Sequence, residues 1–294
     1  MFVLKKSKGD KIADGAIYTF LALFALLTLF PLYYVVIVSV TPYMEVMKNG
    51  GFIIWPEHFT FQAYKEIFSS ARIPQALKIT VFITVVGTVL NMAVTTLLAY
   101  PLSKKAVPGR NFILMGLVFT MIFSGGIIPL YILVRSLGLY DTVWALVIPG
   151  MVSTFNLLIV KTYFENLPPE IEEAAKVDGC GDVTTLFRIV LPLSAPIMAT
   201  IGLFYGVTHW NEYFKGIFYL SDKTLMPMQV VLRSMIQTPN VSTELSVNSL
   251  ALDTLPPETI KMAVVVVATL PLLVIYPFLQ KYFIKGALLG SVKG

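Results

Sequence analysis

The sequence predicts an all-α polytopic membrane protein with six transmembrane helices. Hydrophobic residues make up 56% of the 294 residues and charged residues only 13%, whereas about a quarter of the residues of a soluble domain are charged. The mean hydropathy is +0.77, and long apolar runs recur along the chain. A water-soluble globule is therefore excluded, and we expect a single transmembrane domain over residues 1–294.

Six apolar runs approach the ~20 residues that a helix needs to cross the hydrocarbon core. They are Ile17–Val40, Ile79–Tyr100, Phe112–Leu133, Val143–Val160, Ile197–Phe214 and Met262–Tyr282. The first is too long for a signal peptide and lacks its cleavage motif, so we expect it to be retained. The third contains Ser124-Gly125-Gly126 and Pro129, which predict a kink or a broken helix. Close helix packing through small residues and a place in a pathway both remain open for this segment.

The distribution of basic residues predicts the orientation. Six spans place both termini on one side of the membrane, and the segments on that side carry 13 Lys and Arg residues against 9 on the other. The positive-inside rule then makes both termini cytoplasmic. The margin is small because the predicted outer loops, 41–78 and 215–261, are long and count little in this rule.

Several other classes of protein are excluded by what the sequence lacks. The net charge of +5 comes without a basic run longer than a dipeptide, so nucleic acid is not an expected partner. Cys180 is the one cysteine, and His58 and His209 are far apart, so neither an internal disulfide nor a metal site is expected. No Gly-Lys dipeptide occurs, which excludes the phosphate-binding loop of an ATPase. We therefore expect no cofactor in this chain.

Polar residues inside the predicted spans are candidates for a substrate pathway, because they are costly in a membrane. Besides Asn91, the candidates are Asn156, Tyr205, His209, Trp210, Asn211 and Glu212. Tyr205, His209 and Glu212 recur at helical spacing, and sugars are bound by aromatic faces together with hydrogen-bonding groups. An interfacial belt of aromatic residues explains the cluster equally well, and an interhelical hydrogen bond explains Asn156.

A strongly charged loop over residues 161–196 separates the fourth and fifth spans. Its first part predicts a short helix that begins near Pro169 and ends at Gly179 in a left-handed conformation. A second helix is expected over Asp182–Ile189, with Asp182 as its cap and its end before Leu191-Pro192. The predicted unit is a helix, a turn and a helix on the cytoplasmic face.

This loop resembles the EAA motif of permease subunits in bacterial ATP-binding-cassette importers. Glu-Ala-Ala, three residues, Gly, nine residues and Ile-x-Leu-Pro match at Glu173-Ala174-Ala175, Gly179, Ile189 and Leu191-Pro192. The resemblance implies a type I (MetI-like) permease fold whose motif helix couples to the ATPase. The implied coupling residues are Glu172, Glu173, Ala174, Ala175, Asp178, Gly179, Ile189, Leu191 and Pro192.

The resemblance extends to the carbohydrate-importer branch with MalG-like permeases, and within it to LplC-like and YtcP-like permeases. Ser124–Asp141, His209–Phe214 and the C-terminal residues 280–294 carry it. It implies an import path for oligosaccharides, acidic ones from alginate or pectin among them, with maltose-type sugars or a lipoprotein-linked role as alternatives. It also implies that residues 280–294 form a cytoplasmic tail that reaches toward the ATPase dimer.

The implied importer lies in the bacterial cytoplasmic (inner) membrane. Its other components are a second, different permease, two ATP-binding subunits that hold ATP and Mg, an extracellular solute-binding protein and the membrane lipid. A secondary transporter or channel is the alternative, but we find no inverted repeat, and Glu212 is the one acidic residue in any predicted span. A membrane enzyme lacks a catalytic constellation.

Overall fold

The computed structural model describes residues 8–237 and 257–291, and the side chains of residues 9–237 and 258–277. All regular elements within these ranges are helices, as the sequence predicts. The chain divides into two compact units, one of residues 1–70 with 235–268 and one of residues 71–234 with 269–294.

The first unit contains α1 (Lys8–Ser39), α2 (Tyr43–Lys48), α3 (Gln62–Ser69) and the beginning of α17 (Pro257–Ser291). Most side chains of α1 are apolar and exposed, which suits a helix that lies in lipid or against another membrane subunit. Where α1 ends, Ile37 and Val38 pack with Val46 and Ile53. This unit thus confirms one uninterrupted apolar span near the N-terminus.

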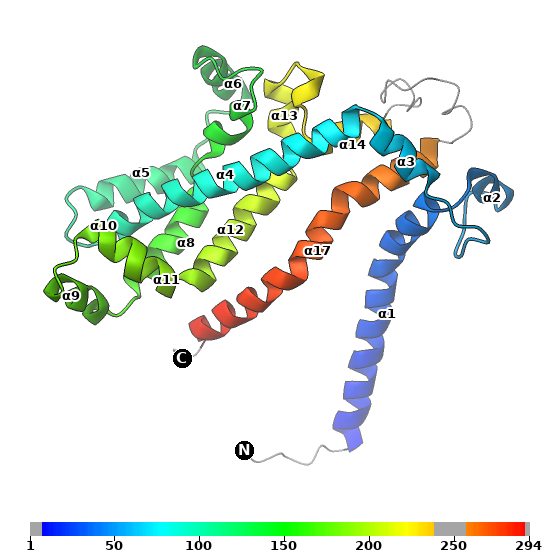
Figure 1. The fold of residues 1–294 in the computed structure, drawn as a ribbon. Coiled ribbons are helices and arrows are strands. Elements are labelled where there is room, and N and C mark those ends of the chain that lie inside the picture. The colour runs from blue at the N-terminus through cyan, green and yellow to red at the C-terminus, as the bar shows by residue number, and fades with distance from the viewer. Residues whose placement is uncertain (1–7, 238–256, 292–294) are drawn as a thin grey trace. The chain divides into compact units, whose positions relative to one another are not determined.

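Three helices form the centre of the second unit. The long helix α4 (Arg72–Ser103) packs along α8 (Thr154–Glu165) and α12 (Ala195–Trp210), as Figure 1 shows. Their buried cluster also takes in the segment before α12, and it consists of Ala99, Tyr100, Val160, Phe164, Leu186, Val190, Ile201 and Tyr205. Apolar burial therefore joins the predicted second, fourth and fifth spans.

The third predicted span is broken, as its small residues suggest. The chain bends by 118° between α5 (Arg110–Ile122) and α6 (Ile127–Ser136). Gly126 has φ +85°, and its N–H donates to Ser124 Oγ at 3.2 Å. Because the 13 residues of α5 extend only about 20 Å, α5 alone is shorter than the hydrocarbon core. The kink or broken helix that the sequence predicts within Phe112–Leu133 is therefore confirmed as a break between Ile122 and Ile127.

The fourth and fifth predicted spans are also interrupted. α7 (Trp144–Val147) continues into a short 3₁₀ turn at Ile148–Gly150, and the chain bends by 51° between this segment and α8. The chain bends by 86° between the helical segment Asp182–Leu193 and α12. Proline lacks an N–H donor, so Pro149 and Pro196 begin new turns rather than continue old ones. Among the described residues, three helices are long and apolar enough to span alone, and up to six spans result if each bent pair counts as one.

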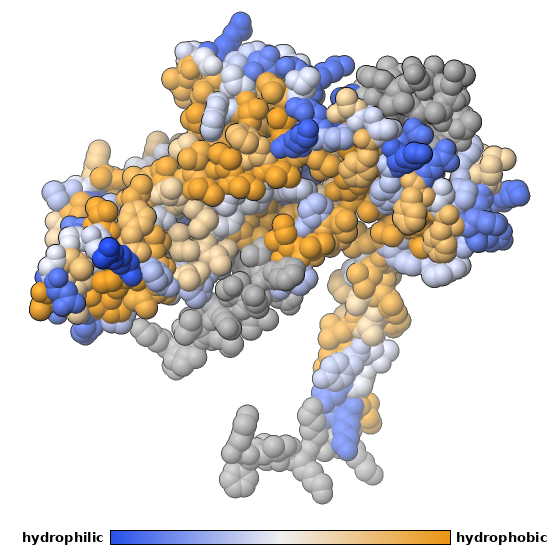
Figure 2. Space-filling view, viewed as in Figure 1, coloured by the Kyte–Doolittle hydropathy of each residue, from blue (hydrophilic) through white to orange (hydrophobic). Residues whose placement is uncertain are grey.

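Short helices cover the two ends of α4. Near its beginning, Thr80 Oγ1 accepts a hydrogen bond from the N–H of Met228 in α14 (Met228–Gln237) at 2.8 Å. α13 (Phe214–Tyr219) and a 3₁₀ turn at Lys223–Leu225 precede α14. At the other end of α4 lies α9 (Pro169–Val177). In Figure 2 the surface over α4 is largely apolar, whereas hydrophilic side chains gather at the α9 end and over α6.

α17 continues beyond the predicted sixth span. Its backbone is helical from Pro257 to Ser291, with Pro271 and Pro277 inside it. The predicted cytoplasmic tail, residues 280–294, therefore begins inside this helix rather than after it. The side chains of this tail lie outside the described residues, so its proposed approach to an ATPase stays a prediction.

Candidate functional site

A cavity of about 890 Å³ opens within the second unit, beside α8 and α12. Its walls are mostly apolar and aromatic, with contributions from Phe155, Phe204 and Tyr276. Hydrogen-bonding or charged side chains reach it at Asn91, Ser153, Asn156, Tyr205, Thr208, His209 and Lys215. Aromatic faces beside amides and hydroxyls form a lining that is suited to a sugar. Four of the polar residues that the sequence analysis named, Asn91, Asn156, Tyr205 and His209, thus line one cavity.

His209 and Asn91 form a buried polar pair between α12 and α4. Asn91 Nδ2 lies 3.2 Å from His209 Nε2 and 3.4 Å from the carbonyl oxygen of Gly150. The two helices approach closely because Gly87 lies against the imidazole, where an added Cβ would come within 2.6 Å of His209 Nε2. Neither Asn91 Oδ1 nor His209 Nδ1 has a hydrogen-bond partner among the described residues. Buried groups without partners are costly, so this pair is a functional candidate.

Tyr205 lines the cavity and connects α12 with α4 and α8 through hydrogen bonds. Its hydroxyl lies 2.7 Å from Thr95 Oγ1 on α4 and accepts a hydrogen bond from the N–H of Ser153 at 3.1 Å. Ser153 is the N-cap of α8, and its side chain accepts from the N–H of Asn156 at 3.4 Å. The Tyr205 hydroxyl is therefore occupied, and this residue contributes its ring to the wall.

The other predicted pathway residues lie outside this cavity. α12 ends at Trp210, so the helical spacing that joined Glu212 to His209 does not continue. The carboxylate of Glu212 instead accepts from the N–H of Lys215 at 3.1 Å and pairs with Lys215 Nζ at 2.9 Å. Trp210 lines a smaller cavity of about 360 Å³ beside α4, and Asn211 Oδ1 accepts from Gln229 Nε2 at 3.4 Å.

Lys215 is a cavity residue that the sequence analysis missed. Its ammonium lines the cavity, donates to the carbonyl oxygen of Leu146 at 3.1 Å and pairs with Glu212. Its position three residues after Glu212 was the feature of the sequence that could have identified it. That spacing places the two charges within reach of one another once a turn follows α12.

The predicted coupling segment forms α9 and the turn that follows it. Pro169 occupies the first helical position, and the helix ends in a Schellman motif. The N–H of Cys180 donates to the carbonyl oxygen of Ala175 at 2.9 Å, and that of Gly179 donates to Lys176 at 3.0 Å. Gly179 has φ +76°, as its predicted left-handed conformation requires.

Four of the predicted coupling residues are exposed, namely Glu173, Ala174, Asp178 and Gly179. Ala175 is buried, and Glu172 is turned inward to pair with Lys104 at the end of α4. None of the described side chains pairs with Glu173. The motif thus presents one carboxylate outward and one toward its own membrane helices.

The second half of the motif differs from the expected helix. Gly181, not Asp182, is the N-cap of α10 (Asp182–Thr185), and the chain continues through a π-helical turn at Leu186–Val190 into α11 (Leu191–Leu193). The expected end before Leu191-Pro192 was therefore wrong. Pro192 sits in the first turn of α11, where no N–H is needed. Leu191 packs against the central cluster, and Ile189 is half-buried.

The described residues contain no group of three His, Cys, Asp or Glu side chains that is arranged to hold a metal ion. The side chains at the cavity offer hydrogen bonding, ring stacking and one compensated charge. α9 offers the exposed carboxylate of Glu173 on a short helix that ends in a sharp turn. These features suit passage of a solute and contact with another protein.

Comparisons with known proteins agree with this arrangement. Residues 78–288 match the family described as the binding-protein-dependent transport system inner membrane component. The chain is 46% identical to the polygalacturonan/rhamnogalacturonan transport system permease protein YtcP of Bacillus subtilis, over 97% of this chain and 99% of that protein. It is 43% identical to the protein LplC of the same organism, over 99% and 98% of the two chains.

A solved structure has the same fold. A chain of a bacterial ABC transporter involved in the import of the acidic polysaccharide alginate superposes with a TM-score of 0.88 at 31% identity, over 96% of this chain and all of that one. The predicted type I, MetI-like permease fold is confirmed, and the secondary-transporter alternative is set aside. The chain belongs to the family of inner membrane components of binding-protein-dependent transport systems, the permease subunits of ABC importers.

Proposed function

We propose that the chain forms half of the translocation path of an importer for acidic oligosaccharides. Its companions are a second, different permease, two ATP-binding subunits that hold ATP and Mg, and an extracellular solute-binding protein. In this arrangement α9 lies on the cytoplasmic face and both termini are cytoplasmic. The exposed carboxylate of Glu173 on α9, at the end of the helices that line the cavity, carries the proposal.

The cavity residues support a saccharide as the solute. The ring of Tyr205 and the amides of Asn91 and Asn156 line one space, and Lys215 brings a cationic group to its edge. Because Glu212 compensates that charge, an acidic sugar is attracted only if the ion pair opens toward it. The acidic substrate class is supported by the relatives, since YtcP is named for polygalacturonan and rhamnogalacturonan and the solved importer for alginate.

The contact surface for the ATPase is proposed to be the outward face of α9. Glu173 and Asp178 offer two charges, Gly179 provides a sharp end, and the exposed side chain of Val177 adds apolar area. Truncation of a charge that becomes buried in such a contact costs about 2–5 kcal/mol. Glu173→Ala is therefore expected to lower transport and substrate-stimulated ATP hydrolysis together, without loss of membrane insertion.

The test uses the complete importer in proteoliposomes with its binding protein. Uptake of an oligogalacturonate is compared with uptake of a maltooligosaccharide of equal length, in the wild type and in Glu173→Ala. The proposal predicts uptake of the acidic sugar and joint loss of uptake and ATP hydrolysis in the variant. Glu170→Ala, an exposed carboxylate on the same helix, is the matched control. Preferred uptake of the neutral sugar contradicts the substrate class, and an unaffected Glu173→Ala variant contradicts the coupling role.

A further inference from the structure

The neighbouring residues Glu172 and Glu173 point away from each other. Glu173 is exposed, whereas the carboxylate of Glu172 forms an ion pair with the ammonium of Lys104, the residue that caps the end of α4. α9 buries only Ala175. Within the described residues, Glu172–Lys104 is also the one ion pair that joins α9 to a membrane helix. The polar attachment of this helix to the transmembrane part thus rests on a single pair.

The surroundings of Lys104 favour a firm pair. Its side chain is 30% exposed and that of Glu172 is 22% exposed, so water screens the two charges less than on an open surface. The ammonium also lies 4.5 Å from the centre of the Tyr100 ring, which packs edge-on against Phe164. Lys104 therefore connects α9 to the buried cluster of the second unit.

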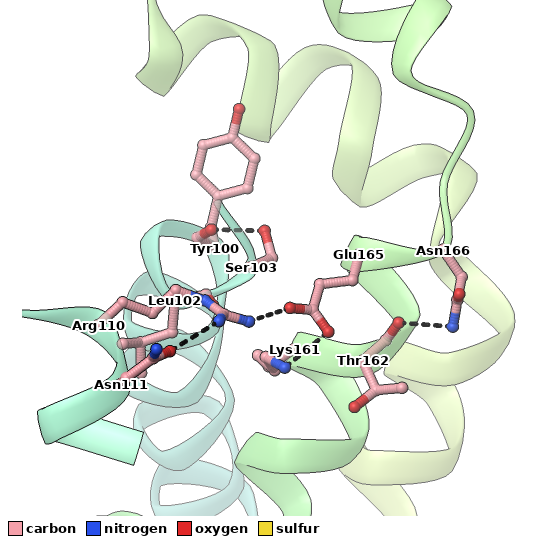
Figure 3. A network of polar contacts seen from close by, with 9 residues as sticks. All are labelled: Tyr100, Leu102, Ser103, Arg110, Asn111, Lys161, Thr162, Glu165 and Asn166. Carbon is pink, nitrogen blue, oxygen red and sulfur yellow. Dashed lines mark hydrogen bonds and ion pairs between the residues drawn. The ribbon is translucent and has the colours of Figure 1, made fainter. Parts of the chain in front are cut away.

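A second group of charges binds the same end of α4 to α5 and α8. Arg110 Nε, at the start of α5, donates to the carbonyl oxygen of Leu102 at 2.8 Å, and its guanidinium pairs with Glu165 of α8. Lys161 Nζ completes the group at 2.6 Å from Glu165. Figure 3 shows how these side chains converge between the helices. At this end the three helices are held together, so a displacement of α4 is shared by α8.

The two helices that are joined here both reach the cavity. α4 contributes Asn91, and α8 contributes Phe155 and Asn156. A force on α9 thus has a route of direct contacts to the two cavity-lining helices, from Glu172 through Lys104 to α4, and from α4 through Arg110 and Glu165 to α8. Coupling through a protein requires such contiguous, firmly packed contacts.

We propose that the Lys104–Glu172 ion pair is the joint that transmits movement of α9 to the cavity-lining helices. Lys104 is then a positioning residue for transport, outside the EAA motif, and Glu172 acts inward rather than on the ATPase. This inference rests on the proposed role of α9 as the ATPase contact. It separates two functions within one helix, because Glu173 receives the force and Glu172 passes it on.

The test follows nucleotide-dependent movement at the cavity directly. The complete importer carries Phe155→Cys, an exposed cavity position on α8, in a Cys180→Ser background. The measured quantities are the rate of labelling by a small thiol reagent, with and without ATP plus vanadate, and the rate of ATP hydrolysis. Lys104→Glu or Glu172→Lys is expected to reduce the nucleotide response of labelling about fivefold or more while ATP hydrolysis continues. The double reversal restores the response, because the pair re-forms with its charges exchanged.

Matched controls and neutral variants complete the design. Lys105→Glu and Glu170→Lys reverse exposed neighbouring charges and should respond as the wild type does. Lys104→Met and Glu172→Gln remove one charge each with little change of shape, which keeps the test decisive if a reversed charge disturbs assembly. The proposal is overturned if labelling in the wild type ignores nucleotide, if single variants respond fully, or if the double reversal gives no restoration. Failure of the proposed function differs, since the ATPase subunits then do not assemble with the wild-type chain.

Discussion

Single glycines set the local geometry at both candidate sites. Gly179 adopts φ +76° at the end of α9, and Gly87 leaves room for the imidazole of His209. A side chain is disfavoured at the two positions for different physical reasons. At Gly179 an added methyl group meets nothing within 4 Å, so only backbone strain opposes it, whereas at Gly87 the backbone is ordinary helix and the neighbouring ring opposes it.

Gly179→Ala is expected to cost about 1 kcal/mol, because a side chain disfavours the left-handed conformation. The strain distorts the turn after α9, so ATP hydrolysis and transport of the complete importer should fall together while membrane insertion stays intact. Gly181→Ala is the matched control, since Gly181 has φ −75° and equally open surroundings. Both rates are measured in proteoliposomes. Equal activity of the two variants would show that the turn has no role in coupling.

Gly87→Ala is expected to destabilise the second unit by about 1–3 kcal/mol, because the new methyl group overlaps the His209 ring. The midpoint of thermal unfolding in detergent should decrease. Gly206→Ala lies in the same helix interface, but its methyl group would be 3.7 Å from Thr88 Oγ1, an ordinary contact. This variant should keep the wild-type midpoint. A lower midpoint for Gly206→Ala than for Gly87→Ala would contradict the close approach at His209.

The Tyr205 hydroxyl connects three helices, because from α12 it forms hydrogen bonds with α4 and with the start of α8. Tyr205→Phe leaves the N–H of Ser153 and the Thr95 hydroxyl without this partner. We expect a loss of about 1–3 kcal/mol and a lower thermal midpoint in detergent. Tyr163→Phe removes a more exposed hydroxyl, 3.4 Å from the carbonyl oxygen of Leu193, and should change the midpoint little. If both variants unfold at the wild-type temperature, the hydroxyl does not hold the three helices together.

Long, unbroken apolar helices could be predicted from the sequence, whereas the positions where other spans break or end were predicted only in part. α1 and α4 are long apolar runs, so composition alone locates them. The break before α6 was predicted because Gly125 and Gly126 remove side chains in mid-span. The end of α12 at Trp210 was missed, because no glycine or proline marks it and the predicted fifth span extended to Phe214. This error placed Glu212 on the wrong face.

At the scale of the whole molecule, pairing between distant residues was beyond prediction. Lys104 and Glu172 are 68 positions apart, and Asn91 and His209 are 118 apart. Sequence spacing gives no information on such contacts, because they depend on how α4 packs against later segments. The coupling motif was predictable because its residues are close in the chain. The cavity was predictable only through its polar residues inside single predicted spans, whereas their meeting in one space was not.

The orientation of the whole chain decides whether the two candidate sites act as proposed, and it follows from the bias of 13 basic residues against 9. In a Cys180→Ser background, Lys105→Cys should be labelled by an impermeant thiol reagent only from the cytoplasmic side. Lys223→Cys should be labelled only from outside. Both positions are exposed and lie beyond opposite ends of the α4 helix, so the pair reports on one spanning element. Labelling in intact cells and in inverted vesicles measures the two sides separately. The reverse pattern would place Glu173 outside, away from any source of ATP, and neither α9 nor Lys104 would then have a force to transmit.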